Sequence, residues 1–385
     1  MTKENINQEF DQYSSVGHEA YGWIEDLFPI CRSITGNGLR KSLKYFQSIL
    51  LNFKIHEVAS GTKIFDWEIP NEWNISEAYV KDETGRKIID MKNNNLHVLQ
   101  YSTPVEGYFT LKQLQEHLYS EPQIPDAIPY RTSFFEPNWG FCLKHSELLR
   151  LKNVEYYVKI NSKITKGSLT YGELKIPSTQ GNKEEILFST YICHPSMANN
   201  ELSGPAICAA LAKEIYKISN RRYNYRFVYV PETIGCLAFL KETLTELQQS
   251  VIAGFQVTCV GNNGPFSYLP STEENNLSDR LIKAVAIGLN LDLKVYPFQQ
   301  RGSDERQYCH PRVNLPVASL MRSKYGNYKE YHTSGDNLNF ISPEGLSGSF
   351  AFYWNMVNVL ENNFTLSAKT IGEPNLGKRG LYSKI

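Results

Sequence analysis

Residues 185–215, EILFSTYICHPSMANNELSGPAICAALAKEI, decide the fold. The stretch opens with a mostly apolar run, which predicts a buried strand, and continues into a loop that carries a histidine. After Ser203, a residue type that caps helices, the apolar residues Ile207, Leu211 and Ile215 recur at helical spacing. A strand, a loop and a helix in this order form the repeating unit of α/β proteins.

The same alternation continues toward the C-terminus. Further apolar runs suited to strands lie at 225–230, 252–260 and 316–322, and helical patterns separate or follow them. We therefore predict an α/β fold with a mostly parallel mixed sheet flanked by helices.

A segment with a different sequence pattern interrupts this alternation of strands and helices. Between residues 61 and 155 the chain consists of short alternating runs broken by proline, which is typical of a small β-rich module. We predict an α/β core formed by residues 14–60 and 156–364, with residues 61–155 inserted as a small β-rich domain. Residues 365–385 are polar and contain glycine and proline, so we expect a flexible tail there.

The composition excludes several classes of partner. Forty basic and forty acidic residues cancel among 385, and no cluster of lysine and arginine stands out, so nucleic acid is not an expected partner. The polar N-terminal segment and the lack of a long apolar run argue against a membrane partner and favour a cytoplasmic protein. The seven cysteines are scattered and never spaced C-x-x-C, which argues against a disulfide framework and a cysteine-rich zinc site. The sequence leaves open whether the chain forms a homo-oligomer.

Reactive side chains follow the predicted strands. His194 follows the first strand and Glu232 the second. Two later segments, RGSDERQYC and YHTSGDNL, contribute Asp304, Glu305, His332 and Asp336. Ligands of open α/β sheets bind at the carboxyl ends of the strands, so these side chains are expected to converge. Two imidazoles that hold zinc and a glutamate that takes a proton from bound water are the basic parts of a hydrolytic metal site.

Several longer motifs resemble those of a known family. The histidine loop, the Ser-Gly helix start, the glutamate after the next strand and the late YHTSGDNL motif are similar to those of M28-type zinc aminopeptidases. A closer resemblance is to a branch of bacterial aminopeptidase-like proteins (DUF4910/DUF2172), often associated with polysaccharide gene sets. It rests on RSITG, IFDWEIPNEWNI, TYICHPSMAN, RFVYVPETIG, RGSDERQYC and LMRSKYGNYKEYHTS and spans roughly residues 17–362. The resemblance implies an aminopeptidase-type core, with His194 and His332 as metal ligands and Glu232 as general base.

The chain departs from the two-zinc members of that family at three positions. Their bridging aspartate falls on Asn200, their second metal-binding glutamate on Thr233 and a further aspartate on Gln256. Two zinc ions bring four positive charges, which amides do not offset, so we expect one zinc ion per chain, with a metal-free site as the alternative. Either Glu201 or the amide oxygen of Asn200 would complete the ligand set with the two histidines.

The remaining candidates have a functional and a structural interpretation. Asp336 would fix the tautomer of His332 as a neighbour of the metal ligand, or it would form a turn bond. Asp304 and Glu305 would bind the ammonium group of a substrate, or they would belong to a structural ion network.

Three functions are compatible with these residues. We expect a metal-dependent hydrolase that cleaves an amide or peptide bond in a small peptide or another amide-bearing substrate, with Glu232 as the base. The alternatives are an acyl or aminoacyl transferase or cyclase on the same scaffold, and a pseudoenzyme that binds ligands through a decayed metal site.

Overall fold

The computed structural model describes residues 12–134, 136–364 and 366–382. Its main element is an eight-stranded sheet formed by β1 (Lys54–Ala59), β10 (Ser168–Ile176), β11 (Glu185–Tyr191), β12 (Asn224–Val230), β13 (Val251–Val257), β14 (Ser267–Leu269), β15 (Lys294–Val295) and β16 (Val317–Met321). The strand order is β1-β10-β12-β11-β13-β16-β14-β15. The central strands β12, β11, β13 and β16 run parallel, whereas β1, β10 and β14 pair in antiparallel fashion. The predicted mostly parallel mixed sheet is confirmed.

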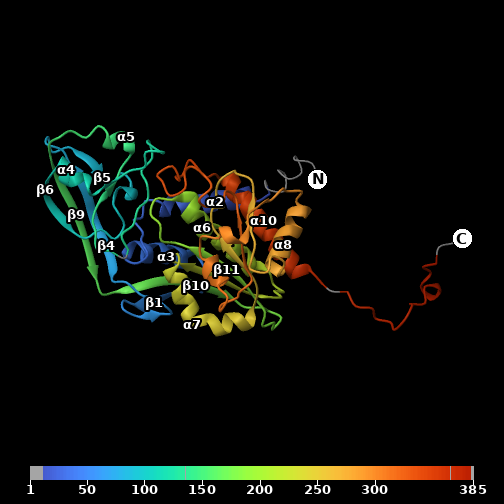
Figure 1. Ribbon diagram of the computed structural model, residues 1–385. Helices are drawn as coiled ribbons and strands as arrows, with labels where there is room; N and C mark the ends of the chain where they lie inside the picture. Colours follow the sequence, from blue (N-terminus) through green and yellow to red (C-terminus); the bar gives the residue numbers. More distant parts are fainter. Residues whose placement is uncertain (1–11, 135, 365, 383–385) are drawn as a thin grey trace.

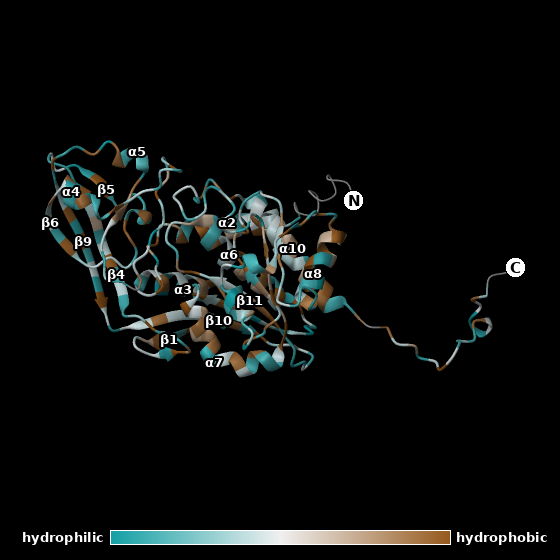
Figure 2. Cartoon of the chain, in the orientation of Figure 1, coloured by the Kyte–Doolittle hydropathy of each residue, from teal (hydrophilic) through white to brown (hydrophobic). Residues whose placement is uncertain are grey.

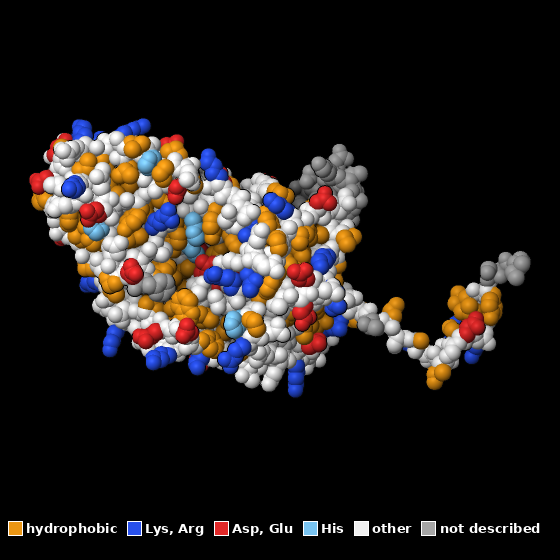
Figure 3. All heavy atoms as spheres, in the orientation of Figure 1, with side chains coloured by type: hydrophobic (Ala, Val, Ile, Leu, Met, Phe, Trp, Pro, Cys, Tyr) orange, Lys and Arg blue, Asp and Glu red, His pale blue; other side chains and the backbone are white. Residues whose placement is uncertain are grey.

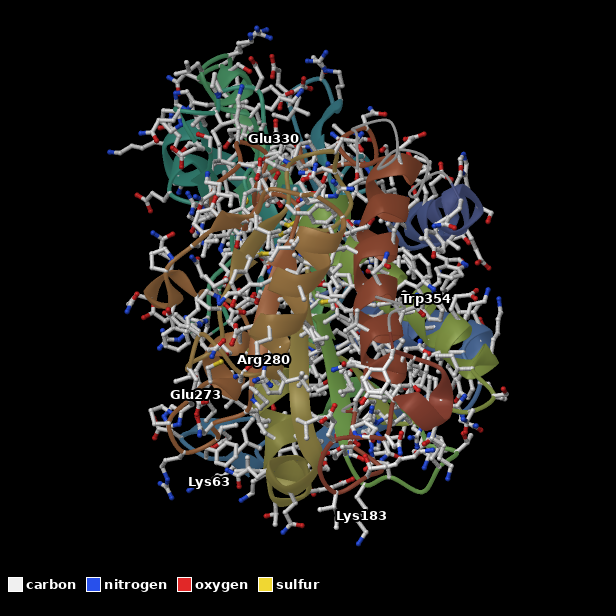
Figure 4. The ribbon with its side chains drawn as sticks, turned by 90° about the vertical axis from the view of Figure 1, so that its right-hand side faces the viewer. Lys63, Lys183, Glu273, Arg280, Glu330 and Trp354 are labelled. Carbon is white, nitrogen blue, oxygen red and sulfur yellow. The ribbon has the colours of Figure 1, made fainter. Side chains whose placement is uncertain are left out.

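Helices cover both faces of this sheet (Figure 1). They are α2 (Ser14–Leu27), α3 (Asn37–Ile49), α6 (Ser203–Lys217), α7 (Ile234–Ser250), α8 (Leu277–Gly288), α9 (Glu305–Tyr308) and α10 (Pro343–Asn362). Two further helices, α4 (Leu111–Gln115) and α5 (His145–Leu148), belong to the segment 61–155, and short 3-10 turns lie at Asn95–His97, Phe298–Gln300 and Gly377–Arg379. Helix α10 contacts α2, α6 and α8, α2 also contacts α6, and Figure 4 shows α8 and α10 side by side.

Alternate residues of the central strands face two different cores. Phe188 and Phe227 pack with the layer of α2, α6, α8 and α10, whereas their chain neighbours Leu187 and Val228 pack with α7. Because both faces are covered, the parallel strands read as continuous apolar runs, which Figure 2 shows as brown and white ribbon inside the molecule.

A smaller four-stranded sheet forms a second layer beside the large one, at the left in Figure 1. Its order is β5-β4-β9-β6, from β4 (Glu72–Lys81), β5 (Lys87–Asp90), β6 (Val105–Thr110) and β9 (Glu155–Thr165). Two short pairs accompany it: β2 (Lys63–Ile64) with β3 (Trp67–Glu68), and β7 (Leu118–Tyr119) with β8 (Phe141–Cys142).

The chain returns to the large sheet later than the sequence places it. The core was predicted to resume at residue 156, but β9 pairs with β4 and β6 in the small sheet, and the large sheet resumes at β10. The two strands follow each other with only Lys166 and Gly167 between them. β9 alternates buried and more exposed residues and β10 is buried along most of its length, but local periodicity does not tell which sheet receives each strand.

The C-terminal segment leaves the body of the molecule. Of the tail predicted at 365–385, the described residues 366–382 extend away from the core in Figure 1. Among the helices in the described part of the chain, none is long and apolar enough to span a membrane.

Candidate functional site

Two loops leave neighbouring parallel strands at the same edge of the large sheet. Tyr191, the last residue of β11, pairs with Val230, the last residue of β12. The loop after β11 carries His194, and the loop after β12 carries Glu232. This pairing brings His194 Nε2 to 3.6 Å from Glu232 Oε2.

The imidazole of His194 lies between two carboxylates. Its Nδ1 is 2.5 Å from Oε2 of Glu201, on the side opposite to Glu232. Both His194 and Glu201 are buried, with 4% and 0% of their surface exposed. A histidine whose Nδ1 faces a carboxylate presents its Nε2 to the ligand. The structure therefore leaves Nε2 of His194 as the nitrogen that faces the site.

A π-helical turn (Ala198–Leu202) carries Glu201 and continues directly into α6. Asp336 accepts hydrogen bonds from the backbone N–H groups of residues 198–200, at 2.6–3.0 Å, and so fixes this turn. Single π-turns of this kind often occur at functional sites. In the described part of the chain, no hydrogen bond joins Asp336 to His332, the partner that the sequence suggested for it.

Unpartnered polar atoms surround the turn. The side-chain amide nitrogen of Asn200 donates to the hydroxyl of Tyr191 at 2.7 Å. Asn200 Oδ1 and Glu201 Oε1 are buried and have no hydrogen-bond partner among the described residues, and neither amide atom of the buried Gln256 has one. Buried oxygen atoms of this kind call for water or a cation.

His332 reaches the site from a late loop, and a tyrosine of the small domain lies against it. The imidazole rings of His194 and His332 are 5.2 Å apart, and the ring of Tyr130 lies 5.0 Å from the first and 5.2 Å from the second. The Tyr130 N–H donates to the carbonyl of His332 at 2.8 Å, and the Ile128 N–H donates to the hydroxyl of Ser334 at 2.9 Å. The small domain therefore forms one wall of the site.

Asp304 and Glu305 point into the protein and support the loop of the proposed base. Asp304 accepts a hydrogen bond from the Thr233 N–H at 2.6 Å, and Glu305 accepts from the N–H groups of Gly302 and Ser303. Both acids are buried, at 0% and 1% exposed. The structural interpretation is therefore the one that their contacts favour.

The surroundings shift the protonation of the central groups. Burial raises the pKa of Glu232 above its ordinary value, although the facing His194 lowers it in part. Burial and the neighbouring His194 hold the pKa of His332 well below its ordinary value, so this imidazole is neutral and keeps its lone pair. Burial opposes charge on His194, but Cys193, Tyr130 and Glu201 together raise the pKa of its imidazole. Burial, helped by Glu232, raises the pKa of Asp304.

A pocket of about 410 Å³ opens beside these groups. Its lining includes His194 and Glu232 from the large sheet, Trp67, Tyr130 and Phe134 from the small domain, and Arg306 from α9. On the face drawn in Figure 3, histidine, acidic and basic side chains lie close together beside a patch of hydrophobic side chains.

Comparison with known proteins gives this chain a family. The family described as "Domain of unknown function (DUF4910)" matches residues 21–363. The chain belongs to the DUF4910 family. A protein of Clostridium acetobutylicum, named provisionally for polysaccharide biosynthesis with an aminopeptidase-like domain, is 44% identical over 99% of this chain and 87% of its own length.

Solved structures agree with the fold of this DUF4910 chain. A crystal structure from Clostridium acetobutylicum, described provisionally as a peptidase, is 44% identical and superposes with a TM-score of 0.91 over 98% of this chain and 89% of that one. A zinc aminopeptidase from Bacillus subtilis is 14% identical, with a TM-score of 0.63 over 89% of this chain and 94% of that one. The fold is thus of the aminopeptidase type, and the resemblance read from the motifs is confirmed.

Sequence reasoning missed two residues of the site in this DUF4910 protein. Tyr130 lies in the segment predicted as a separate domain, and no local signal joins it to the histidines. Arg32 belongs to the RSITG motif and is fully buried, and its Nε donates to the carbonyl of His194 at 3.1 Å. A charged residue inside a distinctive motif was the signal that would have marked it.

Proposed function

We propose that this protein is a metal-assisted hydrolase of the aminopeptidase type that cleaves an amide bond in a small substrate. The observation that carries the proposal is the 3.6 Å separation of His194 Nε2 and Glu232 Oε2 at the wall of a pocket, with His332 beside them. The aminopeptidase-like name of the Clostridium relative and the fold shared with a zinc aminopeptidase support the reaction class.

The side chains of the site fit one divalent cation. The imidazoles of His194 and His332 would hold it, and Asn200 offers a buried amide oxygen without a partner among the described residues. Glu201 would orient His194 through Nδ1, as carboxylates do for metal-bound histidines. When bound, zinc would lower the pKa of a coordinated water and polarise a substrate carbonyl. Because Asn200 and Gln256 are neutral, the site does not balance the charge of a second ion.

Glu232 would act as the general base. The Ser303 hydroxyl donates to its Oε1 at 2.9 Å, and this bond leaves Oε2 as the oxygen beside His194. The raised pKa of Glu232 suits a group that takes a proton from attacking water and then gives it to the leaving nitrogen. Hydrolysis adds the water oxygen to the acyl carbon, breaks the C–N bond and releases a carboxylic acid and an amine.

Elemental analysis of purified protein, supplied with zinc, tests the metal. We expect about one zinc per chain in the wild type and loss of zinc in both His194→Ala and His332→Ala. His56→Ala is the matched control, because this histidine lies on β1 and pairs with Glu173. Two zinc ions per chain would contradict the roles given to Asn200 and Gln256, and no zinc at all would favour a binding protein.

Amide hydrolysis is then assayed on zinc-loaded protein with a panel of dipeptides and N-acyl amino acids, and Glu232→Gln serves as the inactive comparison. Zinc binding with no hydrolysis, but with acyl transfer to an added amine, would replace the hydrolase by the transferase alternative.

A further inference from the structure

The pocket beside Glu232 continues into a second hollow. Trp67 and Gln307 line both, and the second hollow has a volume of about 370 Å³. Its remaining lining is largely apolar and includes Phe65, Leu237 and Leu244. We call the two hollows together the Trp67 groove. This groove leads from the reacting side chains across the indole of Trp67.

Aromatic side chains of the small domain stand at the middle of the groove. Phe65, in the turn between β2 and β3, is 52% exposed, and Trp67, the first residue of β3, is 37% exposed. Aromatic rings that line a groove offer a large apolar contact area to a ligand. The groove therefore suits a substrate with an apolar side chain next to the amide bond.

Two exposed arginines of the groove offer binding partners for an anion. Arg306 lines the first hollow beside Glu232, and Arg312 lines the second. The Arg306 Nε donates to the Ser303 carbonyl at 3.3 Å, which ties this guanidinium to the loop that holds Glu232. A guanidinium binds a carboxylate through paired hydrogen bonds and repels an ammonium group.

The lining of the groove holds few carboxylates that would bind a substrate ammonium. Among the described residues, Glu232 and Asp66 are the carboxylates that line it. Glu232 is engaged by Ser303 and faces His194, and Asp66 is an exposed residue of the β2–β3 turn. The second oxygens of Asp304 and Glu305 have no partner among the described residues, but neither residue lines the groove.

We infer that the Trp67 groove selects amides whose leaving part is an apolar amino acid with a free carboxylate. These are N-acyl amino acids and the carboxyl ends of short peptides. The apolar side chain would lie on Trp67 and Phe65, and the carboxylate would pair with Arg306. The reaction rests on the proposed function, whereas the recognition of the carboxylate does not.

Binding of uncleavable ligands tests this selection. The probes are N-methylsulfonyl-L-phenylalanine, whose sulfonamide resists amide hydrolysis, its neutral primary carboxamide, and the cationic L-phenylalaninamide. Isothermal titration calorimetry on the full-length protein should give the acid an affinity about tenfold or more above that of either other probe, because a hydrogen bond to a charged group is involved.

Variants assign the preference to a residue. Arg306→Gln should reduce the ratio between acid and carboxamide to about one, and Arg306→Lys, which keeps the charge, should retain part of it. Arg280→Gln is the matched control, because Arg280 is an exposed arginine of α8 that lines neither hollow (Figure 4). Thermal melting shows whether each variant is folded.

The outcomes separate the two proposals. Equal binding of acid and carboxamide, tighter binding of L-phenylalaninamide, or no binding of any probe would overturn the inference, as would a preference that survives in folded Arg306→Gln. Hydrolysis of N-acetyl-L-phenylalanine is measured separately. Selective binding of the acid probe without hydrolysis of N-acetyl-L-phenylalanine would contradict the proposed function and support the inference. Equal hydrolysis of N-acetyl-L-phenylalanine and its carboxamide would support the proposed function and contradict the inference.

Discussion

The carboxylate behind His194 offers the sharpest test of how the site is built. In Glu201→Gln the amide oxygen still accepts the Nδ1 proton of His194, but the negative charge 2.5 Å from that nitrogen is lost. Glu201 is fully buried, so little water replaces the lost interaction. If Glu201 orients the imidazole and makes Nε2 a stronger metal ligand, zinc binding must weaken in this variant.

The size of the effect follows from this geometry. Removing a carboxylate that orients a metal-bound histidine costs about 10–100-fold in metal affinity. At about 1.4 kcal/mol per factor of ten, the loss is about 1.4–2.8 kcal/mol of binding free energy. The affinity is measured by competition between metal-free protein and a fluorescent zinc chelator at constant pH.

A second buried carboxylate supplies the control. Glu185 lies on β11, the same strand that leads to His194, but its carboxylate pairs with Arg226 at 2.7 Å. Glu185→Gln should therefore leave zinc affinity unchanged. An affinity of Glu201→Gln within about twofold of the wild type would refute the orienting role. A fall of about a thousandfold or more would make Glu201 a ligand itself, since both limits lie outside the range for an orienting group.

Three further predictions concern the base and the fold. Glu232→Gln should lower kcat/KM by about 10²–10⁴-fold. The wild-type kcat/KM should fall on acidification through a pKa above the ordinary carboxylic value, because burial raises the pKa of Glu232 and only its ionised form accepts a proton. A fall centred near the ordinary carboxylic pKa would contradict this. Arg226→Met should lower the free energy of unfolding, measured in urea, by about 3–5 kcal/mol, because it leaves the buried carboxylates of Glu173 and Glu185 without their partner. The same change at the exposed Arg86 should lower it little. Equal losses in the two variants would contradict the reasoning. Gly204→Ala should cost about 1–3 kcal/mol in the same assay, since its Cβ would lie 2.2 Å from the Val257 carbonyl oxygen, whereas Gly22→Ala meets nothing within 4 Å and should not destabilise the protein.

Some residues of the candidate site can be predicted from the sequence, and others cannot. His194 and Glu232 were found because each directly follows an apolar strand, and the ends of neighbouring parallel strands lie together by the rules of the fold. The direction of a side chain within a loop obeys no such rule. Ser196, Thr233 and His332 all have positive φ angles, at 48°, 64° and 55°, and non-glycine residues adopt such angles only where surrounding contacts hold them.

Asp304 and Glu305 illustrate the same limit. Acidic residues in a loop near a predicted site are equally suited to substrate and to structure on local grounds. Glu305 bonds locally to the backbone of Gly302 and Ser303, whereas the bond from the Thr233 N–H to Asp304 joins segments 71 residues apart, and the burial of both acids depends on such long-range contacts. Only the packing of those segments removes the two acids from the pocket.

The sequence by itself determined the α/β core and the family, and it predicted the small β-rich insertion and the two residues at the strand ends, because periodicity and motifs are local properties. The tertiary structure alone decided that Glu201 meets Nδ1 of His194, that Asp336 fixes the turn at 198–200, and that Tyr130 and Trp67 of the insertion wall the pocket. Glu201 lies only seven residues after His194, but the π-helical turn that carries Glu201 brings the two side chains together. The contacts of Asp336, Tyr130 and Trp67 join segments distant in the sequence, so they depend on tertiary packing and not on the pattern of any one stretch.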